Sequence, residues 1–466
     1  MALLKQSTDF NRLWITAALL IFFSSDISAG SWDYGHRISL GANYSDNPTL
    51  ADDDRDVDSL FKMLASYNLD IEWSEANRTF AMQPRITRDY YPDSDNSDLE
   101  STDYIIPGQF TILRDRGSLG LIFNFREQNI LSTEAAIIDS PDTTNFRADD
   151  TRNTYNLGFN YSYILTPRDQ INIGASWLKT DFDLDYTGRA DSDGYLANGS
   201  YSHSLTNRQS IGFSFNYFQS DSDALDCLND VLGYEDINGQ PSASFDPCRD
   251  DQVNIKRETE SDTFSATFNY RAVLTPTLEF SARYGRRKTN NESRVRDANG
   301  NLLTVVVIDP INGPIRVPAF TDFKTDSTGD TYDISLSGNY QRYRFDLGGT
   351  RTITPSSNGT PNNTTAIRLT QTYNLTQKAS AKLILRGTER EDAVREASNA
   401  PDRKTRTFEG DLRLSYRLSR KWNLGFGYKY RYRERDEAAL FGVQKQKASS
   451  NRFNLSINYI LKQIPN

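Results

Sequence analysis

The stretch that decides the fold is WNLGFGYKYRYRER, residues Trp422 to Arg435. Every second residue in it is apolar or aromatic, and the residues between are small, polar or basic. A period of two is the signature of a β-strand, because successive side chains point to opposite faces of a sheet. The apolar set is Trp422, Leu424, Phe426, Tyr428, Tyr430 and Tyr432, and the other set is Asn423, Gly425, Gly427, Lys429, Arg431 and Arg433.

The same alternation recurs from end to end of the chain, with aromatic residues at the ends of the apolar stripes. In a soluble sandwich the apolar face would meet a core. A recurring alternation with aromatic residues at the ends of the apolar stripes instead indicates a barrel whose apolar face contacts lipid and whose polar face lines a water-filled lumen. The sequence therefore predicts an all-β fold, a single antiparallel transmembrane β-barrel of the bacterial outer membrane with about 18 strands. An even number of strands places both ends of the barrel in the periplasm.

The amino-terminal segment predicts export. The chain has 466 residues and a mean hydropathy of -0.64, which disfavours helical membrane spans. Its only long apolar run, Leu13 to Phe23, follows Lys5 and Arg12 and precedes the small residues Ser28 and Ala29. This is the pattern of a secretory signal peptide, and the run is short for a membrane anchor. We expect a signal peptide over 1–29 and a barrel over 30–466, with no plug before the first strand.

A hairpin repeat supports the barrel. Strands end in x-Leu-Thr or x-Leu-Ser followed by two turn residues, with a spacing of roughly 40 residues. Propeller blades would have four short strands per repeat, whereas two long ones are present here. The connections at the other end are long and acidic, which predicts short periplasmic turns and long extracellular loops. The five repeats begin at Ile164, Ser204, Val273, Asn374 and Arg417.

Few residues suggest chemistry. A serine-histidine dyad would need one of only two histidines, His36 and His203, and His203 takes a position that tyrosine holds in sister repeats. It is therefore interpreted as an interfacial girdle residue, and no enzyme activity, cofactor or metal is expected. The acidic segment 52–58 could bind a cation, but it lacks the spacing of a calcium loop, so a solvated loop is favoured. Cys227 and Cys248 lie in one predicted loop and are expected to form a disulfide.

The inward positions of the last hairpins form a basic stripe, opposed by Glu409 and Asp411. Elsewhere the inward face carries asparagine and serine, such as Asn172 and Asn216. Charged pore walls set ion selectivity, so the stripe favours anionic or sugar-like solutes. The alternative is that acidic loop residues neutralise the arginines. The predicted pore-lining stripe is Lys382, Arg386, Arg390, Arg413, Arg417, Lys429, Arg431, Arg433 and Arg435.

The net charge of -9 argues against nucleic-acid binding. The expected surroundings are outer-membrane lipids and lipopolysaccharide, and no oligomeric state is readable. Two apolar runs, Leu302 to Ile308 and Ile315 to Val317, flank the turn segment Asp309 to Pro314 and predict a further hairpin. Because an exposed apolar hairpin needs cover, we expect it to pack over the barrel mouth and restrict the pore.

The opening strand from Gly35, running into Tyr44-Ser45-Asp46-Asn47-Pro48, resembles the start of the β-barrel porin-2 family. That family includes outer-membrane proteins encoded with exopolysaccharide or exosortase systems. The resemblance implies a porin-sized outer-membrane barrel serving polysaccharide export, with polysaccharide-secretion machinery as a partner. A general uptake porin and a structural or surface-binding barrel plugged by its own loops are the alternatives. A barrel hydrolase is disfavoured by the scarcity of histidine.

Overall fold

The computed structural model describes residues 30–47, 59–92, 100–129, 151–183, 190–227, 254–297, 304–309, 313–318, 323–355, 361–392, 404–439 and 442–462. In these ranges no helix has the length and apolar character needed to cross a membrane. The regular elements are β1 Ser31–Ser45, β2 Leu60–Glu75, β3 Arg78–Met82, β4 Arg85–Tyr90, β5 Ser101–Arg114, β6 Gly117–Asn129, β7 Thr151–Thr166, β8 Asp169–Phe182, β9 Ala190–Thr206, β10 Gln209–Cys227, β11 Asn254–Thr275, β12 Leu278–Asp297, β13 Thr304–Asp309, β14 Gly313–Pro318, β15 Phe323–Asn339, β16 Tyr343–Pro355, β17 Pro361–Asn374, β18 Ala379–Asp392, β19 Lys404–Arg417, β20 Trp422–Ala439 and β21 Gly442–Lys462.

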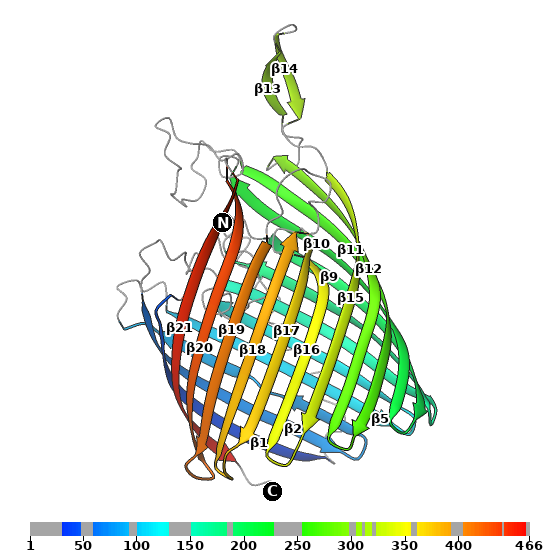
Figure 1. Cartoon of the computed structure of the whole chain (residues 1–466), viewed down its shortest axis with the longest axis vertical. Helices are drawn as coiled ribbons and strands as arrows, with labels where there is room; N and C mark the ends of the chain where they lie inside the picture. The colour runs from blue at the N-terminus through cyan, green and yellow to red at the C-terminus, as the bar shows by residue number, and fades with distance from the viewer. Residues whose placement is uncertain are drawn as a thin grey trace.

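The main sheet closes on itself as an antiparallel barrel of tilted strands (Figure 1). Its 19 strands occupy 18 positions, because β3 and β4 share the place between β2 and β5. β1 pairs with β2 on one side and with β21 on the other, so the first strand joins the last. Closure leaves no unpaired sheet edge, which is a condition for strands to lie in a bilayer. The predicted barrel of about 18 strands is confirmed.

One predicted strand is interrupted. The sequence predicts a continuous strand from Arg78 to Tyr91, but the structure separates β3 from β4 at Gln83 and Pro84. Proline has no backbone N–H, so Pro84 cannot continue the ladder as a donor. Its carbonyl instead accepts a bond from the Leu69 N–H at 3.0 Å. Pairing with β2 and β5 resumes beyond the break without a change of register.

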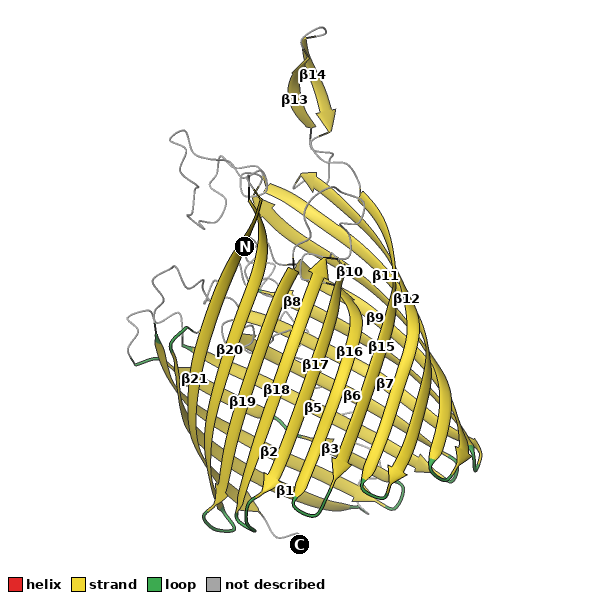
Figure 2. Ribbon diagram, viewed as in Figure 1, coloured by secondary structure: helices red, strands yellow, loops and turns green. Residues whose placement is uncertain are grey.

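The two ends of the barrel differ as the sequence predicts. Short turns connect the strands at one end, and the longer connections lie at the other (Figure 2). In all five repeat turns the Thr or Ser hydroxyl accepts a hydrogen bond from the backbone N–H two residues later. These bonds join Thr166 to Arg168 at 3.2 Å, Thr206 to Arg208 at 3.1 Å, Thr275 to Thr277 at 3.3 Å, Thr376 to Lys378 at 3.1 Å and Ser419 to Lys421 at 3.2 Å. The repeat is therefore a side-chain-capped turn.

The alternation gives the barrel an apolar exterior. On β11, Phe264 and Phe268 are exposed on the outer face, whereas Thr263 and Thr267 are buried on the inner face. The outward apolar stretch of β11 runs from Phe264 to Ala272, which matches the 9–11 residues or so that a strand needs to cross the hydrocarbon core. The rest of this 22-residue strand continues toward the loop end with charged outward residues. A closed barrel with such a belt is an integral outer-membrane protein.

The predicted hairpin within 302–317 exists, but its predicted place is wrong. β13 pairs with β14 in a separate two-stranded sheet, in which Thr304 is opposite Pro318 and Asp309 is opposite Gly313. Figure 1 shows this hairpin standing clear of the barrel rim, beyond the ends of β12 and β15. It does not pack over the barrel mouth. The physical reason is that β13 and β14 form their backbone hydrogen bonds with each other. The hairpin therefore does not need to pair with a barrel strand to satisfy those groups.

Candidate functional site

The candidate site is the inner face of β18–β21, called the basic wall below. Cross-strand pairing places its charges side by side: Lys382 is opposite Arg413, and Glu409 lies between Arg386 and Arg431. The register places every residue of the predicted stripe on the face opposite the apolar exterior stripe. The nine positions are Lys382, Arg386 and Arg390 on β18, Arg413 and Arg417 on β19, and Lys429, Arg431, Arg433 and Arg435 on β20.

Two carboxylates of the wall itself bind part of the stripe. Glu409 Oε2 lies 2.8 Å from Lys429 Nζ and 3.4 Å from Arg431 Nε. Asp411 Oδ2 lies 2.5 Å from Arg413 Nη2. Glu409 and Asp411 are both buried, which strengthens these pairs relative to exposed ones. Three of the nine cations thus share two anions, both of which lie on β19.

Arg431 is the most enclosed cation of these pairs. Its side chain is only 9% exposed, against 20% for Lys429 and 60% for Arg413. Its Nη2 has no hydrogen-bond partner among the described residues. A guanidinium has five N–H donors, and the single carboxylate of Glu409, which also serves Lys429, does not match them all. Because Nε and Nη2 are buried, Arg431 can act on an anion in the lumen through its charge but not by direct contact from these two atoms.

A second charged group continues the basic wall across the closure of the barrel. Arg452 of β21 is paired in register with Lys429, and Ser45 of β1 is its partner on the other side. The alternation in the sequence predicts a last strand from Phe453 to Leu461, which leaves Arg452 outside it. The strand in fact begins at Gly442. The alternation of Ser450, Arg452 and Asn454 against Phe453 and Leu455 was the signal that could have found it.

Beyond this seam lies a part-buried ion pair between Lys62 of β2 and the buried Asp89 of β4, with 2.7 Å between Nζ and Oδ2. Lys62 Nζ also lies 5.9 Å from the centroid of the buried Tyr91 ring. Burial, together with the negative charge of Asp89, raises the pKa of Tyr91, so its hydroxyl stays protonated. Sequence reasoning did not identify this cluster, because β2 and β4 are distant from β21 in the chain. They come near it only because β1 pairs with both β2 and β21 and closes the barrel.

The opposite part of the lumen is lined mainly by uncharged, hydrogen-bonded side chains. Here the inner residues of β8–β12 and β15 are mainly Ser, Thr and Asn, and we call this surface the neutral wall. Two arginines of β12 lie among them: Arg283 donates to Asn269 at 3.0 Å and Arg287 donates to Thr263 at 3.3 Å. Its side chains bind one another across strands: Ser214–Thr267 at 2.6 Å, Asn269–Ser214 at 3.2 Å, Thr263–Thr289 at 3.0 Å, Ser281–Ser335 at 2.7 Å and Asn172–Ser200 at 3.2 Å. The amide and hydroxyl side chains of this wall therefore bind one another in small cross-strand groups.

Both histidines lie on the outer face near the turn end. His203 Nδ1 lies 2.7 Å from Asp169 Oδ1, which also accepts a bond from the Tyr201 hydroxyl at 2.6 Å. His36 Nδ1 lies 2.7 Å from the Tyr67 hydroxyl. The tyrosine neighbour and outward direction of His203 agree with the girdle role predicted for it, and His36 has a similar setting.

The remaining sequence predictions lie wholly or partly outside the described residues. The signal peptide over 1–29, the acidic segment 52–58 and Cys248 are all outside, so the Cys227–Cys248 disulfide stays a prediction. Among the described residues no group of three or more His, Cys, Asp or Glu side chains could hold a metal ion.

Comparison with known proteins gives no family assignment. No protein-family model matches, so the porin-2 resemblance gains no support there, and no curated protein matches. Solved outer-membrane barrels are similar in part. OccAB3 of Acinetobacter baumannii is 11% identical over 92% of this chain and 99% of that chain, with a TM-score of 0.43. The ferric citrate transporter FecA is 8% identical over 92% and 79%, with a TM-score of 0.46. The ferric-catecholate receptor Fiu of E. coli K12 is 9% identical over 91% and 81%, with a TM-score of 0.45.

Proposed function

We propose that this barrel is an outer-membrane channel that favours anionic or sugar-like solutes. The observation that carries the proposal is the division of the lumen into a basic wall on β18–β21 and a neutral hydroxyl and amide wall on β8–β15. Barrels of 16–18 strands or so are wide enough to enclose an aqueous channel. The comparisons add nothing to this, because the similarity is too low to carry an argument about the solute.

The basic wall supplies the selectivity. Lys429 and Arg431 share one carboxylate, Glu409, and Arg452 adds a further cation beside Lys429. Cations gathered on one side of a low-dielectric cavity raise the local concentration of anions. Salt screens each exposed charge within about 10 Å at 0.1 M, so the wall acts on solutes that pass close to it.

The neutral wall supplies passage without a deep binding site. Its hydroxyls and amides are already bound to one another, as Ser214 is to Thr267 and Asn269. A hydrated solute can exchange one such bond for another at little net cost. Conduction requires binding that is weak and distributed, and this lining meets that requirement.

Among outer-membrane channels for such solutes, we favour a role in polysaccharide export over a role as a general uptake porin. Support comes from the resemblance of the opening strand to the porin-2 family and from the many sugar-compatible hydroxyl and amide groups. A deletion strain tests this directly: loss of secreted polysaccharide supports export. Normal secretion would leave the uptake porin as the better assignment.

Reversal potentials in a salt gradient test the channel itself. The native protein in planar bilayers should prefer anions, and Arg431→Gln with Arg433→Gln should reduce that preference. Lys445→Gln is the matched control, because Lys445 lies on the outer face and pairs with Glu434 at 3.0 Å. Cation preference in the native protein, or an equal change in the control, would reject the basic wall as the selectivity element. Absence of any conductance would favour the plugged barrel.

A further inference from the structure

Cations recur on the short turns at the periplasmic end. Eight short turns join the barrel strands there, and the last turn residue before the next strand is Lys or Arg in six of them. All six side chains are exposed. We call them the turn cations: Arg116, Arg168, Arg208, Arg342, Lys378 and Lys421.

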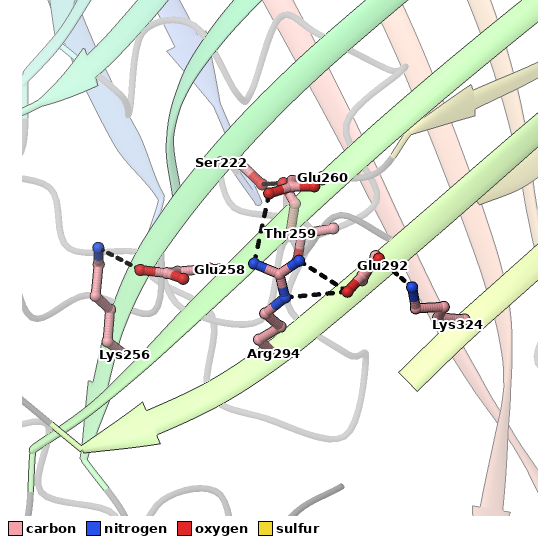
Figure 3. Close-up of polar contacts among 8 residues, drawn as sticks. All are labelled: Ser222, Lys256, Glu258, Thr259, Glu260, Glu292, Arg294 and Lys324. Atoms are coloured by element: carbon pink, nitrogen blue, oxygen red, sulfur yellow. Dashed lines mark hydrogen bonds and ion pairs between the residues drawn. The ribbon is translucent and has the colours of Figure 1, made fainter. Parts of the chain in front are cut away.

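The turn cations differ from the outward-facing cations at the loop end. There, Arg294 lies 2.8 Å from Glu292 and 3.7 Å from Glu260, and Lys324 lies 2.7 Å from Glu292 (Figure 3). Lys256 likewise lies 2.7 Å from Glu258. Across the described part of the chain, none of the six turn cations has a carboxylate within ion-pair distance. The loop-end cations named here are thus paired with carboxylates, whereas the turn cations are exposed without one among the described residues.

An apolar residue accompanies four of the six turn cations, Arg168, Arg208, Lys378 and Lys421, and the fifth repeat turn ends in Thr277. In the five repeat turns a leucine three residues before the end of the turn continues the outward stripe of its strand. These leucines are exposed by 43% to 51%, although they stand beside polar turn residues. They are Leu165, Leu205, Leu274, Leu375 and Leu418. Each therefore faces the lipid boundary.

Backbone hydrogen bonds hold this rim in one arrangement. The carbonyl of Arg116 accepts from the Ile164 N–H at 2.7 Å, and that of Arg168 accepts from the Ser204 N–H at 2.8 Å. The carbonyls of the other four turn cations are bound in the same way, by Val273, Asn374, Arg417 and Ile460. Each turn is thereby fixed to the next hairpin, so the cations are displayed around the circumference of the barrel.

We propose that this rim binds the phosphate groups of anionic phospholipids in the periplasmic leaflet. A phospholipid carries a phosphate directly above an acyl chain, which matches a cation next to an outward leucine. Long basic side chains at a membrane interface reach to the headgroups while their stems stay in apolar surroundings. A soluble acidic partner docked beneath the barrel would account for the cations but not for leucines on the lipid side.

Lipid selectivity of the purified full-length protein tests the proposal. The protein is reconstituted in phosphatidylcholine vesicles, and its association with spin-labelled phosphatidylglycerol is compared with that of spin-labelled phosphatidylcholine. A cation near an anionic headgroup contributes about a fivefold effect at low salt. We therefore expect a preference of this order for phosphatidylglycerol, falling as ionic strength rises. No preference at low salt overturns the proposal without any variant.

The variant to compare carries Arg168→Gln, Arg208→Gln, Lys378→Gln and Lys421→Gln. It should lose the phosphatidylglycerol preference while keeping native conductance, because these residues lie outside the basic wall. The matched control carries Lys256→Gln, Lys324→Gln, Arg406→Gln and Lys445→Gln at the loop end and should keep the preference. Unchanged preference in the turn variant overturns the proposal.

Two further arms separate other sources of negative charge. Millimolar inorganic phosphate should not displace the labelled lipid, and displacement would mean a free-phosphate site instead. If the turn variant kept its lipid preference but no longer sedimented with purified peptidoglycan, the partner would be an anionic periplasmic polymer and the lipid proposal would be wrong.

Discussion

The two walls of the lumen share one backbone architecture and differ in how their polar groups are satisfied. On the neutral wall, Ser214, Thr267 and Asn269 satisfy one another and carry no net charge. On the basic wall, Glu409 serves both Lys429 and Arg431. The neutral wall is thus stabilised by many small and replaceable bonds. The basic wall depends on a few carboxylates whose loss leaves charge buried, so stability and solute selectivity are linked there.

The largest expected effect comes from removing the shared carboxylate. Glu409→Gln keeps the shape of the side chain but leaves Lys429 and Arg431 enclosed without their counter-charge. Breaking one partner of a buried pair costs about 3–5 kcal/mol. Urea unfolding in lipid vesicles, followed by heat-modifiable gel mobility, measures the loss. A loss no larger than that of a single neutral-wall substitution would show that other groups compensate these cations.

The next largest effect is expected from a comparison of the same substitution on the lipid face and on the lumen face of β20. Phe426→Arg puts a cation into the lipid belt and should cost about 2–4 kcal/mol near the midplane. Gly427→Arg puts it on the basic wall, where a Cβ would meet Asn454 Cβ at 3.4 Å, an ordinary contact. The second variant should assemble normally and show greater anion preference in bilayer recordings. Equal loss of assembled protein in both variants would contradict the assignment of the faces.

The smallest effect is expected on the neutral wall. Ser214→Ala removes one hydroxyl bound by Thr267 and by Asn269, and a net loss of about 0.5–1.5 kcal/mol should follow. The reversal potential should stay that of the native protein, because no charge changes. A shift in ion preference from this variant would mean that the neutral wall also takes part in selectivity, and the contrast between the walls would be lost.

Sequence reasoning found the strands but not their full length. The alternation predicts that the last strand begins at Phe453, whereas β21 begins at Gly442. Near the loop end the outward positions become charged, as Lys445 is, so the apolar-polar alternation disappears although the ladder continues. It also did not predict the break at Pro84, because the alternation of side chains carries no information about the backbone N–H that proline lacks. The turns were found because their Leu-Thr and Leu-Ser signature is local.

The sequence alone determined which face each side chain takes, because alternation is a property of a single strand and needs no partner. It therefore separated Phe426 from Arg431 and identified the basic stripe. Only the tertiary structure decided which charges meet, because that depends on register and closure between strands distant in sequence. Closure through β1 brings Arg452 toward the pair of Lys62 and Asp89. Register places Glu409 opposite Arg431, and that pairing determines how much of the positive charge of the basic wall is balanced within the wall.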